Sequence, residues 1–219
     1  MHDEAYRRRI EGMWGLRFLA VALALQAGIR PAAGQSTRPA DLGPGKLLVA
    51  ARDLPDPNFA KTVVLLVQYD RDGVVGLIVN RRSKVPISSV LDNVAGAKKR
   101  SDTVYAGGPV SQTDVLALLR SRKQPGEAAR VLADVFLLTG KEDLEQAFAS
   151  AVEPERMHVY AGYAGWTQPQ LENELDSGAW FIFPGSAASV FDADPDSLWS
   201  RLIRETEIDV ARVAFPRAR

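Results

Sequence analysis

The sequence predicts an α+β fold in one domain, and three observations support this. Short apolar runs rich in β-branched residues outnumber the helical patterns. The strand patterns also follow one another in runs, where a doubly wound sheet would alternate strands with helices. After residue 45 we find no internal repeat and no low-complexity linker, so one domain is the economical interpretation.

The first half of the domain is predicted to consist mainly of strands. Residues 46–51, 61–68 and 74–79 are the first three, and Tyr69 to Gly73 between the last two has the composition of a tight turn, which predicts a hairpin. Residues 87–94 are weakly helical, and residues 103–106 form a short strand that the Gly-Gly-Pro of residues 107–109 ends.

The second half mixes strands with three helices. Strands are expected at residues 115–119, 131–138, 159–163, 180–183 and 190–191. One helix begins at a capping box of Thr139 and Glu142 and runs to residue 148. A second begins at Thr167 with Gln170 and ends at Gly178, and the last runs from Pro195 through residue 204 with Asp194 as its N-cap.

Residues 1–34 have the three regions of a secretory signal. An Arg-rich start precedes the apolar run of residues 18–25, and the small residues Ala32, Ala33 and Gly34 follow, which predicts cleavage after Gly34. The apolar run is shorter than the ~20 residues that a membrane-spanning helix needs, so the mature protein is expected to have no transmembrane helix. The expected location is therefore exported and periplasmic. The alternative is a mis-called start codon and a cytoplasmic protein.

Residues 35–44 then form a flexible lead-in and residues 45–215 the folded domain. The full chain carries 27 basic and 27 acidic residues, and loss of residues 1–34 would leave a net charge of −2. This balance lacks the basic footprint of a nucleic-acid binder, so we expect no nucleic-acid partner. The chain has no Cys and two His, so no metal and no cofactor is expected.

The acid–amide set of Asp56, Asn58 and Asn80 is the best candidate for a polar ligand site. Asp56 and Asn58 lie between two apolar strands and Asn80 ends the third, so the fold can bring them to one sheet edge. Such groups bind a small polar ligand or a hard cation. The alternative is that Asp56 and Asn58 form turns and Asn80 satisfies a strand end, as these residues often do.

Tyr163 and Trp166 are the second pair of ligand-binding candidates, because flat aromatic surfaces can stack on a planar ligand. The alternative is that these side chains belong to the core of a half-buried strand. Gly162 and Gly165 beside them suit positive φ or close backbone approach. His158 is expected to be a partly buried structural residue, because no Gly-x-Ser-x-Gly elbow accompanies it; no catalytic residue is assigned.

Several short motifs in register resemble the AlgH/YqgE family of bacterial proteins. They occupy residues 45–50, 54–59 with 62–66, 73–81, 105–110, and 162–166 with 170–172 and 178–180. The resemblance implies a compact mixed α/β fold with a partly barrel-like sheet, no established catalytic activity, and a reputation as a regulator. The chain departs from the family pattern at Arg82, where a Pro often stands, at Pro169, where a Gly often stands, and in its export-like start.

The sequence therefore predicts a non-enzymatic binding or accessory protein whose partner is a small ligand or another protein. Two alternatives stay open. One is a hydrolase-like or transferase-like enzyme that uses Asp56 and Asn80, and the other is a cytoplasmic regulator of transcription.

Overall fold

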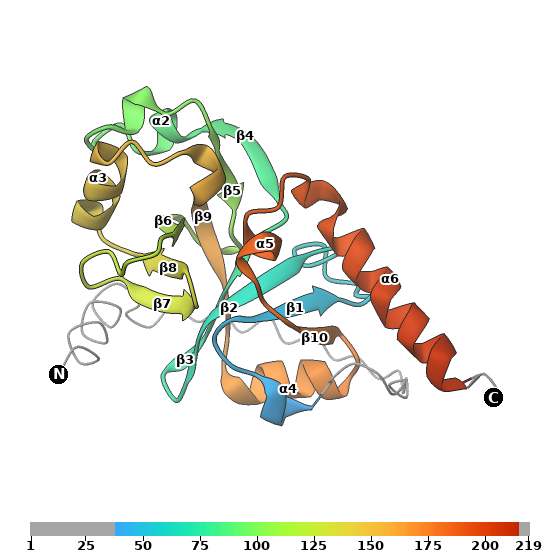
Figure 1. Ribbon diagram of the computed structural model, residues 1–219. Helices are drawn as coiled ribbons and strands as arrows, with labels where there is room; N and C mark the ends of the chain where they lie inside the picture. Colours follow the sequence, from blue (N-terminus) through green and yellow to red (C-terminus); the bar gives the residue numbers. More distant parts are fainter. Residues whose placement is uncertain (1–37, 215–219) are drawn as a thin grey trace.

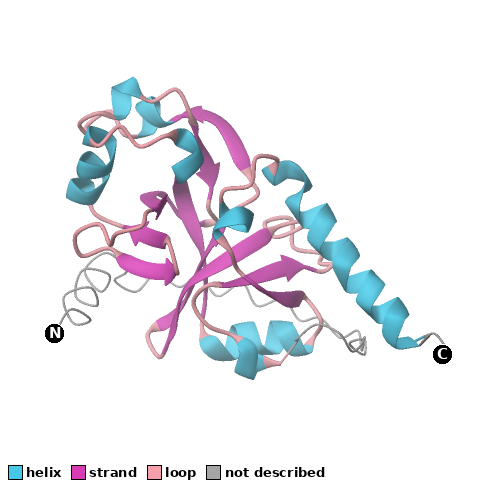
Figure 2. Cartoon of the chain, in the orientation of Figure 1, coloured by secondary structure: helices cyan, strands magenta, loops and turns pink. Residues whose placement is uncertain are grey.

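The computed structural model describes residues 38–214, with side chains up to Thr206, and shows one compact α+β domain. Its ten strands form a curled half-barrel sheet in the order β10-β1-β2-β3-β9-β6-β8-β7, with β5 attached to β9 and β4 to β5 (Figure 1). All strand pairs are antiparallel except β5 with β9. Five α-helices of the described residues lie around this sheet, and Figure 2 draws the helices in cyan.

The first sheet segment consists of β1 (Lys46–Ala50), β2 (Val63–Asp70), β3 (Gly73–Ile78) and β10 (Trp180–Pro184). The β2–β3 hairpin is paired as predicted. Most side chains of these strands are buried on both faces, which explains why β1, β2 and β3 read as continuous apolar runs. Helices α4 (Gln168–Asp176) and α6 (Pro195–Ala214) pack against this segment, and Trp199 of α6 donates to the carbonyl of Ala50 at 2.8 Å.

A second apolar cluster fills the other half of the curled sheet. It packs β6 (Val110–Arg120) and β8 (Val135–Leu138) against α2 (Ile87–Val90) and α3 (Lys141–Ala149), while β7 (Ala129–Leu132) pairs with β8 at the edge of the sheet. The remaining short elements are β4 (Arg82–Pro86), β5 (Thr103–Ala106), α5 (Ala187–Val190) and the 3-10 turns Pro39–Asp41, Ala97–Lys99 and Pro154–Arg156.

Strand β9 (Met157–Trp166) joins the two halves, because it pairs with β3, β5 and β6. The strand runs through Gly162 and Gly165, where the sequence suggested an end. Only Gly162 has a positive φ, of 70°, and a Cβ there would lie 2.6 Å from the carbonyl oxygen of Gly108. Gly165 is not left-handed, and its nearest neighbour would be the Tyr163 ring at 3.3 Å. The close backbone approach is therefore at Gly162.

The helix signals were largely confirmed. Thr167 caps α4 by accepting from the backbone N–H of Gln170, and Gly178 follows that helix with φ of 78°. Helix α6 begins at Pro195 as predicted but continues ten residues further, to Ala214. Helix α3 begins one residue later than the Thr139 capping box predicts, with Gly140 at its N-cap.

One predicted strand is absent from the structure and one strand was not predicted, both for local reasons. Residues 190–191 were predicted as a strand, yet Val190 ends α5, because the Ser186 side chain accepts from the N–H of Ser189 and starts a helical turn. Strand β4 was missed, since its sequence Arg-Ser-Lys-Val-Pro is polar and exposed and ends in Pro. The predicted strand over 131–138 is a hairpin of β7 and β8.

The predicted signal segment, residues 1–34, lies outside the described residues. Of the lead-in, the structure describes residues 38–44. They include the 3-10 turn Pro39–Asp41, and the Leu42 side chain packs against the core. Within residues 38–214 no helix has the length and apolar character needed to cross a membrane.

Candidate functional site

The connection between β1 and β2, residues 51–62, forms a long ordered loop at one end of the sheet, which we call the β1–β2 loop. Its turn is built around Asp56, whose carboxylate accepts from the N–H of Asn58 at 2.8 Å. The carbonyl of Asp56 accepts from the N–H groups of Phe59 and Ala60 at 3.0 and 2.8 Å. This Asx turn is the alternative that the sequence left open for Asp56.

Asn80 fastens the base of the β1–β2 loop from the end of β3. Its Oδ1 accepts from the N–H of Val63 at 2.8 Å, and its Nδ2 donates to the carbonyl of Lys61 at 3.0 Å. Lys61 has a φ of 58°, which a non-glycine residue adopts only when its surroundings hold it there. Asn80 is 9% exposed, so its amide serves the main chain.

Arg81 fastens the tip of the same loop. Its guanidinium donates to the carbonyls of Asn58 and Ala60 at 2.8 and 3.3 Å. Burial lowers the pKa of Arg81, and the nearby Asp56 carboxylate acts against that shift. The structure thus brings Asp56, Asn58 and Asn80 into one neighbourhood, as the sequence places them. It adds Arg81, to which the sequence analysis assigned no role.

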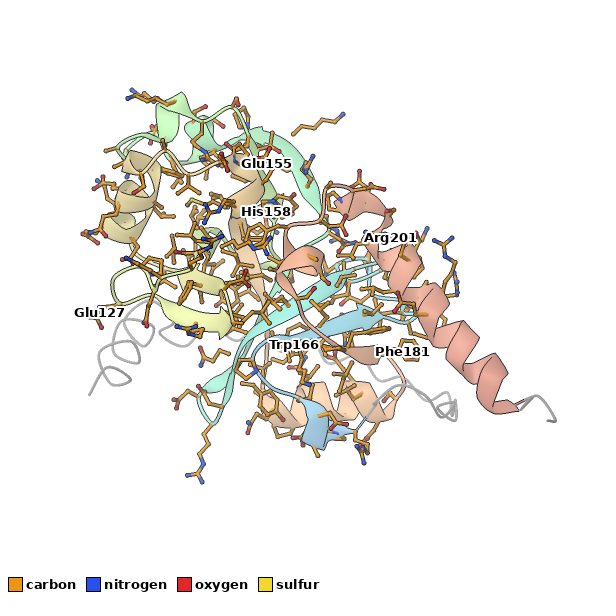
Figure 3. The ribbon with its side chains drawn as sticks, in the orientation of Figure 1. Glu127, Glu155, His158, Trp166, Phe181 and Arg201 are labelled. Atoms are coloured by element: carbon orange, nitrogen blue, oxygen red, sulfur yellow. The ribbon has the colours of Figure 1, made fainter. Side chains whose placement is uncertain are left out.

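Phe59 seats the β1–β2 loop on the core. Its ring lies 5.5 Å from the rings of both Trp166 and Trp180, stacked on the first and edge-on to the second. The two indole N–H groups donate to one carboxylate oxygen of Glu174 at 3.0 and 2.8 Å. Trp166 is 1% exposed, so the ring predicted to stack on a ligand stacks on Phe59 within the protein. Figure 3 shows Trp166 above α4.

Tyr163, the other aromatic candidate, lies on β9 beside the irregular start of β6. Its hydroxyl interacts with Ser111, which has a φ of 43° in a segment where the β6–β9 register shifts. Burial raises the pKa of Tyr163, and the nearby Asp114 carboxylate adds to that shift. The structure places Tyr163 with Ser111 and Asp114, and sequence spacing gave no signal for this group.

His158 is the centre of an aromatic cluster on the opposite part of β9 (Figure 3). Its imidazole stacks on Tyr105 at 4.5 Å and lies 4.9 Å from Phe191. Arg82 donates to the Tyr105 hydroxyl at 3.2 and 3.3 Å, which ties β4 to this cluster. Tyr160 is fully buried next to Tyr105 at 5.5 Å.

Burial lowers the pKa of His158 from 6.5 to about 4, and the positive charge of Arg82 contributes. Arg100 adds to this effect, whereas Asp102 and the carbonyl of Val190 favour the charged form. The imidazole is therefore neutral near pH 7. Among the described residues, no group of three or more His, Asp and Glu side chains could hold a metal ion.

Comparison with known proteins gives a consistent result over the folded domain. A family model described as AlgH-like matches residues 47–211. A UPF0301 protein of Streptomyces coelicolor is 36% identical over 178 residues, which cover 78% of this chain and 90% of that protein. A UPF0301 protein of Thermobifida fusca is 38% identical over 187 residues, which cover 78% and 91%.

Two solved structures share the fold. The solution structure of the AlgH protein from Pseudomonas aeruginosa superposes with a TM-score of 0.61 at 28% identity and covers 80% of this chain and 94% of that protein. The crystal structure of protein DIP2367 from Corynebacterium diphtheriae gives 0.63 at 24% identity and covers 75% and 87%. The chain belongs to the AlgH-like family, whose function is uncharacterised.

Proposed function

We propose that this chain is a non-enzymatic binding or accessory protein whose β1–β2 loop is the binding surface. One observation carries the proposal: the loop exposes polar side chains on its outer side while its inner side is fastened to the sheet by Phe59, Asn80 and Arg81. At 12 residues (51–62) the connection is longer than the median of about 4–6 residues, and long surface loops often carry function.

The fastening matters because binding by a mobile loop is weakened by the entropy lost when the loop orders. The loop conformation is set before any partner arrives. It is held by the turn at Asp56, by the left-handed backbone of Lys61 and by the two hydrogen bonds of the Asn80 side chain. The exposed polar residues of the loop are Arg52, Asp53, Asn58 and Lys61, so the surface offers a partner both hydrogen-bond donors and acceptors.

The enzyme alternative uses Asp56 and Asn80, and the same contacts weigh against it. Both the oxygen and the nitrogen of the Asn80 side-chain amide bond to the main chain, and one carboxylate oxygen of Asp56 closes a turn. A general base or an oxyanion donor has to reach the reacting atoms, whereas these groups face the loop itself.

The test is a co-purification from the native host with native mass spectrometry of whatever remains bound. The tagged wild type is compared with Asn58→Ala, which keeps the main-chain bonds of the loop, and with Glu127→Ala, an exposed acid in a distant loop (Figure 3). We expect one bound species with the wild type and Glu127→Ala that falls at least about tenfold with Asn58→Ala. Equal retention by all three proteins, or substrate turnover that Asp56→Ala abolishes, would contradict the proposal.

We further propose that the protein acts after export, on the strength of the Arg-rich start, apolar run and small residues of positions 1–34. Cells that produce a C-terminally tagged protein are fractionated and its N-terminus is sequenced. A start near Gln35 in the periplasmic fraction is expected. A full-length product in the cytoplasm would contradict export and favour the mis-called start.

A further inference from the structure

The aromatic cluster around His158 adjoins the β1–β2 loop through the consecutive residues Arg81 and Arg82, and it contains two polar atoms that the fold leaves without a partner. His158 and Tyr160 are two residues apart on β9, so both side chains project from the same face of the strand. His158 is 8% exposed and Tyr160 fully buried, and the Tyr105 ring lies 4.5 and 5.5 Å from their two rings.

The unpartnered atoms are Nδ1 of His158 and the hydroxyl oxygen of Tyr160, both buried among the described residues. Buried polar atoms nearly always have a hydrogen-bond partner, either in the protein or in an ordered molecule, because leaving them bare costs their full hydration. The two rings lie 6.5 Å apart, centroid to centroid, so one small group between them is the simplest partner for both atoms.

The protonation state of the imidazole restricts what that group can be. The ring interacts with the backbone carbonyl of Val190, which only an N–H can do, and burial together with Arg82 and Arg100 keeps the ring neutral. Nδ1 is then an acceptor and requires a donor. A carboxylate or phosphate dianion only accepts, and a cation would be repelled by Arg82, since Arg100 is paired with Asp102.

We propose that this cluster is a binding site for a neutral hydroxyl group, which donates a hydrogen bond to His158 Nδ1 and shares a second with the Tyr160 hydroxyl. Nδ1 requires a donor and the Tyr160 hydroxyl can either donate or accept, and a hydroxyl is the smallest neutral group that satisfies both atoms in either arrangement. It belongs either to an ordered water molecule or to a small alcohol whose apolar part contacts the Tyr105 and Phe191 rings.

Crystal structures of the wild type, grown without alcohol and after soaking in methanol, separate these two sources. We expect an oxygen within about 2.6–3.2 Å of both atoms in the unsoaked crystal. Density for a methyl group beside it after soaking identifies a site for small alcohols, and an unchanged single oxygen identifies a water site. An empty cluster in both crystals, or an imidazole whose Nδ1 bonds to a protein group, would overturn the proposal.

A variant gives an independent answer in solution. Tyr160→Phe removes only the hydroxyl, so the melting temperature falls by about 2–4 °C if that hydroxyl is bonded. Tyr69→Phe calibrates the effect, because the Tyr69 hydroxyl donates to Glu172 at 3.0 Å. An unchanged or higher melting temperature for Tyr160→Phe would show a bare hydroxyl and reject the site.

One readout needs no variant and applies even if Tyr160→Phe fails to fold. The chain has two His residues, so nitrogen-15 labelling of histidine gives a simple spectrum in which contacts with the Tyr105 and Phe191 rings assign His158. The expected signal is that of a neutral ring whose Nδ1 accepts a hydrogen bond. The signal of an Nδ1 that accepts none would contradict the proposal.

Discussion

His158 illustrates how strongly a buried side chain depends on its neighbours. The ring is packed between Tyr105 and Phe191, and the charges that act on it are Arg82, Arg100 and Asp102. Sequence analysis identified it as a partly buried structural residue, and the structure confirms the burial. The cluster around it could not be predicted, because Tyr105 and Arg82 reach β9 through β5 and β4, and β4 gave no strand signal in the sequence.

We predict that His158 makes the protein less stable as the pH falls from 6.5 to 4. The pKa of the folded state, about 4, is below the unfolded value of 6.5, so the unfolded chain binds the proton first and stability is lost on acidification. The loss approaches about 3 kcal/mol at the low end of this range. Urea unfolding of the wild type and His158→Phe at several pH values measures it, and parallel pH profiles for the two proteins would contradict the prediction.

At the level of elements, local sequence signals were reliable where one side chain decides the structure. Thr167 caps α4 and Pro195 begins α6, both as predicted, because a cap or a fixed φ acts within one turn. Signals failed where distant contacts decide. Strand β9 runs through Gly162 because the backbone of Gly108 lies against it, and spacing along the chain does not reveal that contact.

We predict that Gly162→Ala destabilises the fold far more than Gly165→Ala. At Gly162 the positive φ and the contact of 2.6 Å with the Gly108 carbonyl oxygen both oppose a side chain, at a combined cost of about 3 kcal/mol. At Gly165 a Cβ meets only the Tyr163 ring at 3.3 Å. Urea denaturation of the two variants measures this difference. Equal free energies of unfolding would show that the close approach at Gly162 does not make a side chain there destabilising.

For the whole molecule, the curled sheet supports two polar groups that meet at consecutive residues, because Arg81 holds the β1–β2 loop and Arg82 bonds to Tyr105 of the His158 cluster. The β1–β2 loop lies at the end of β1 and β3, and the His158 cluster lies where β5 joins β9. Chain-wide charge is balanced at 27 basic and 27 acidic residues. The neighbourhood of Asp56, Asn58 and Asn80 could be predicted from strand ends, whereas the fastening by Arg81 could not, since it depends on loop geometry.

We predict that the protein does not bind DNA with more than weak affinity, although its family has a reputation in regulation. Even real binders reach only ~10⁻⁴ to 10⁻⁶ M for non-specific DNA at physiological salt, and this chain lacks the net positive charge that drives such binding. Fluorescence anisotropy with a promoter fragment and a scrambled fragment checks this. Salt-sensitive micromolar binding that favours the promoter would support the regulator alternative.

We predict that the β1–β2 loop is already formed before it meets a partner, and hydrogen exchange of the free protein tests this most directly. We expect the N–H groups of Phe59, Ala60 and Val63 to be protected in the wild type. Asn80→Ala should make them exchange about tenfold to a hundredfold faster, because it removes the acceptor for Val63 and the donor for Lys61.

Two comparisons make that result specific. Asn173→Ala on the exposed side of α4 is the matched control, and we expect it to leave the loop unchanged. The amide of Leu65 in β2 reports whether Asn80→Ala loosens the whole sheet, and we expect its exchange rate to change far less than the rates of the loop amides. Loop amides that exchange in the wild type as fast as in an unfolded chain would show that the β1–β2 loop is not formed in the free protein.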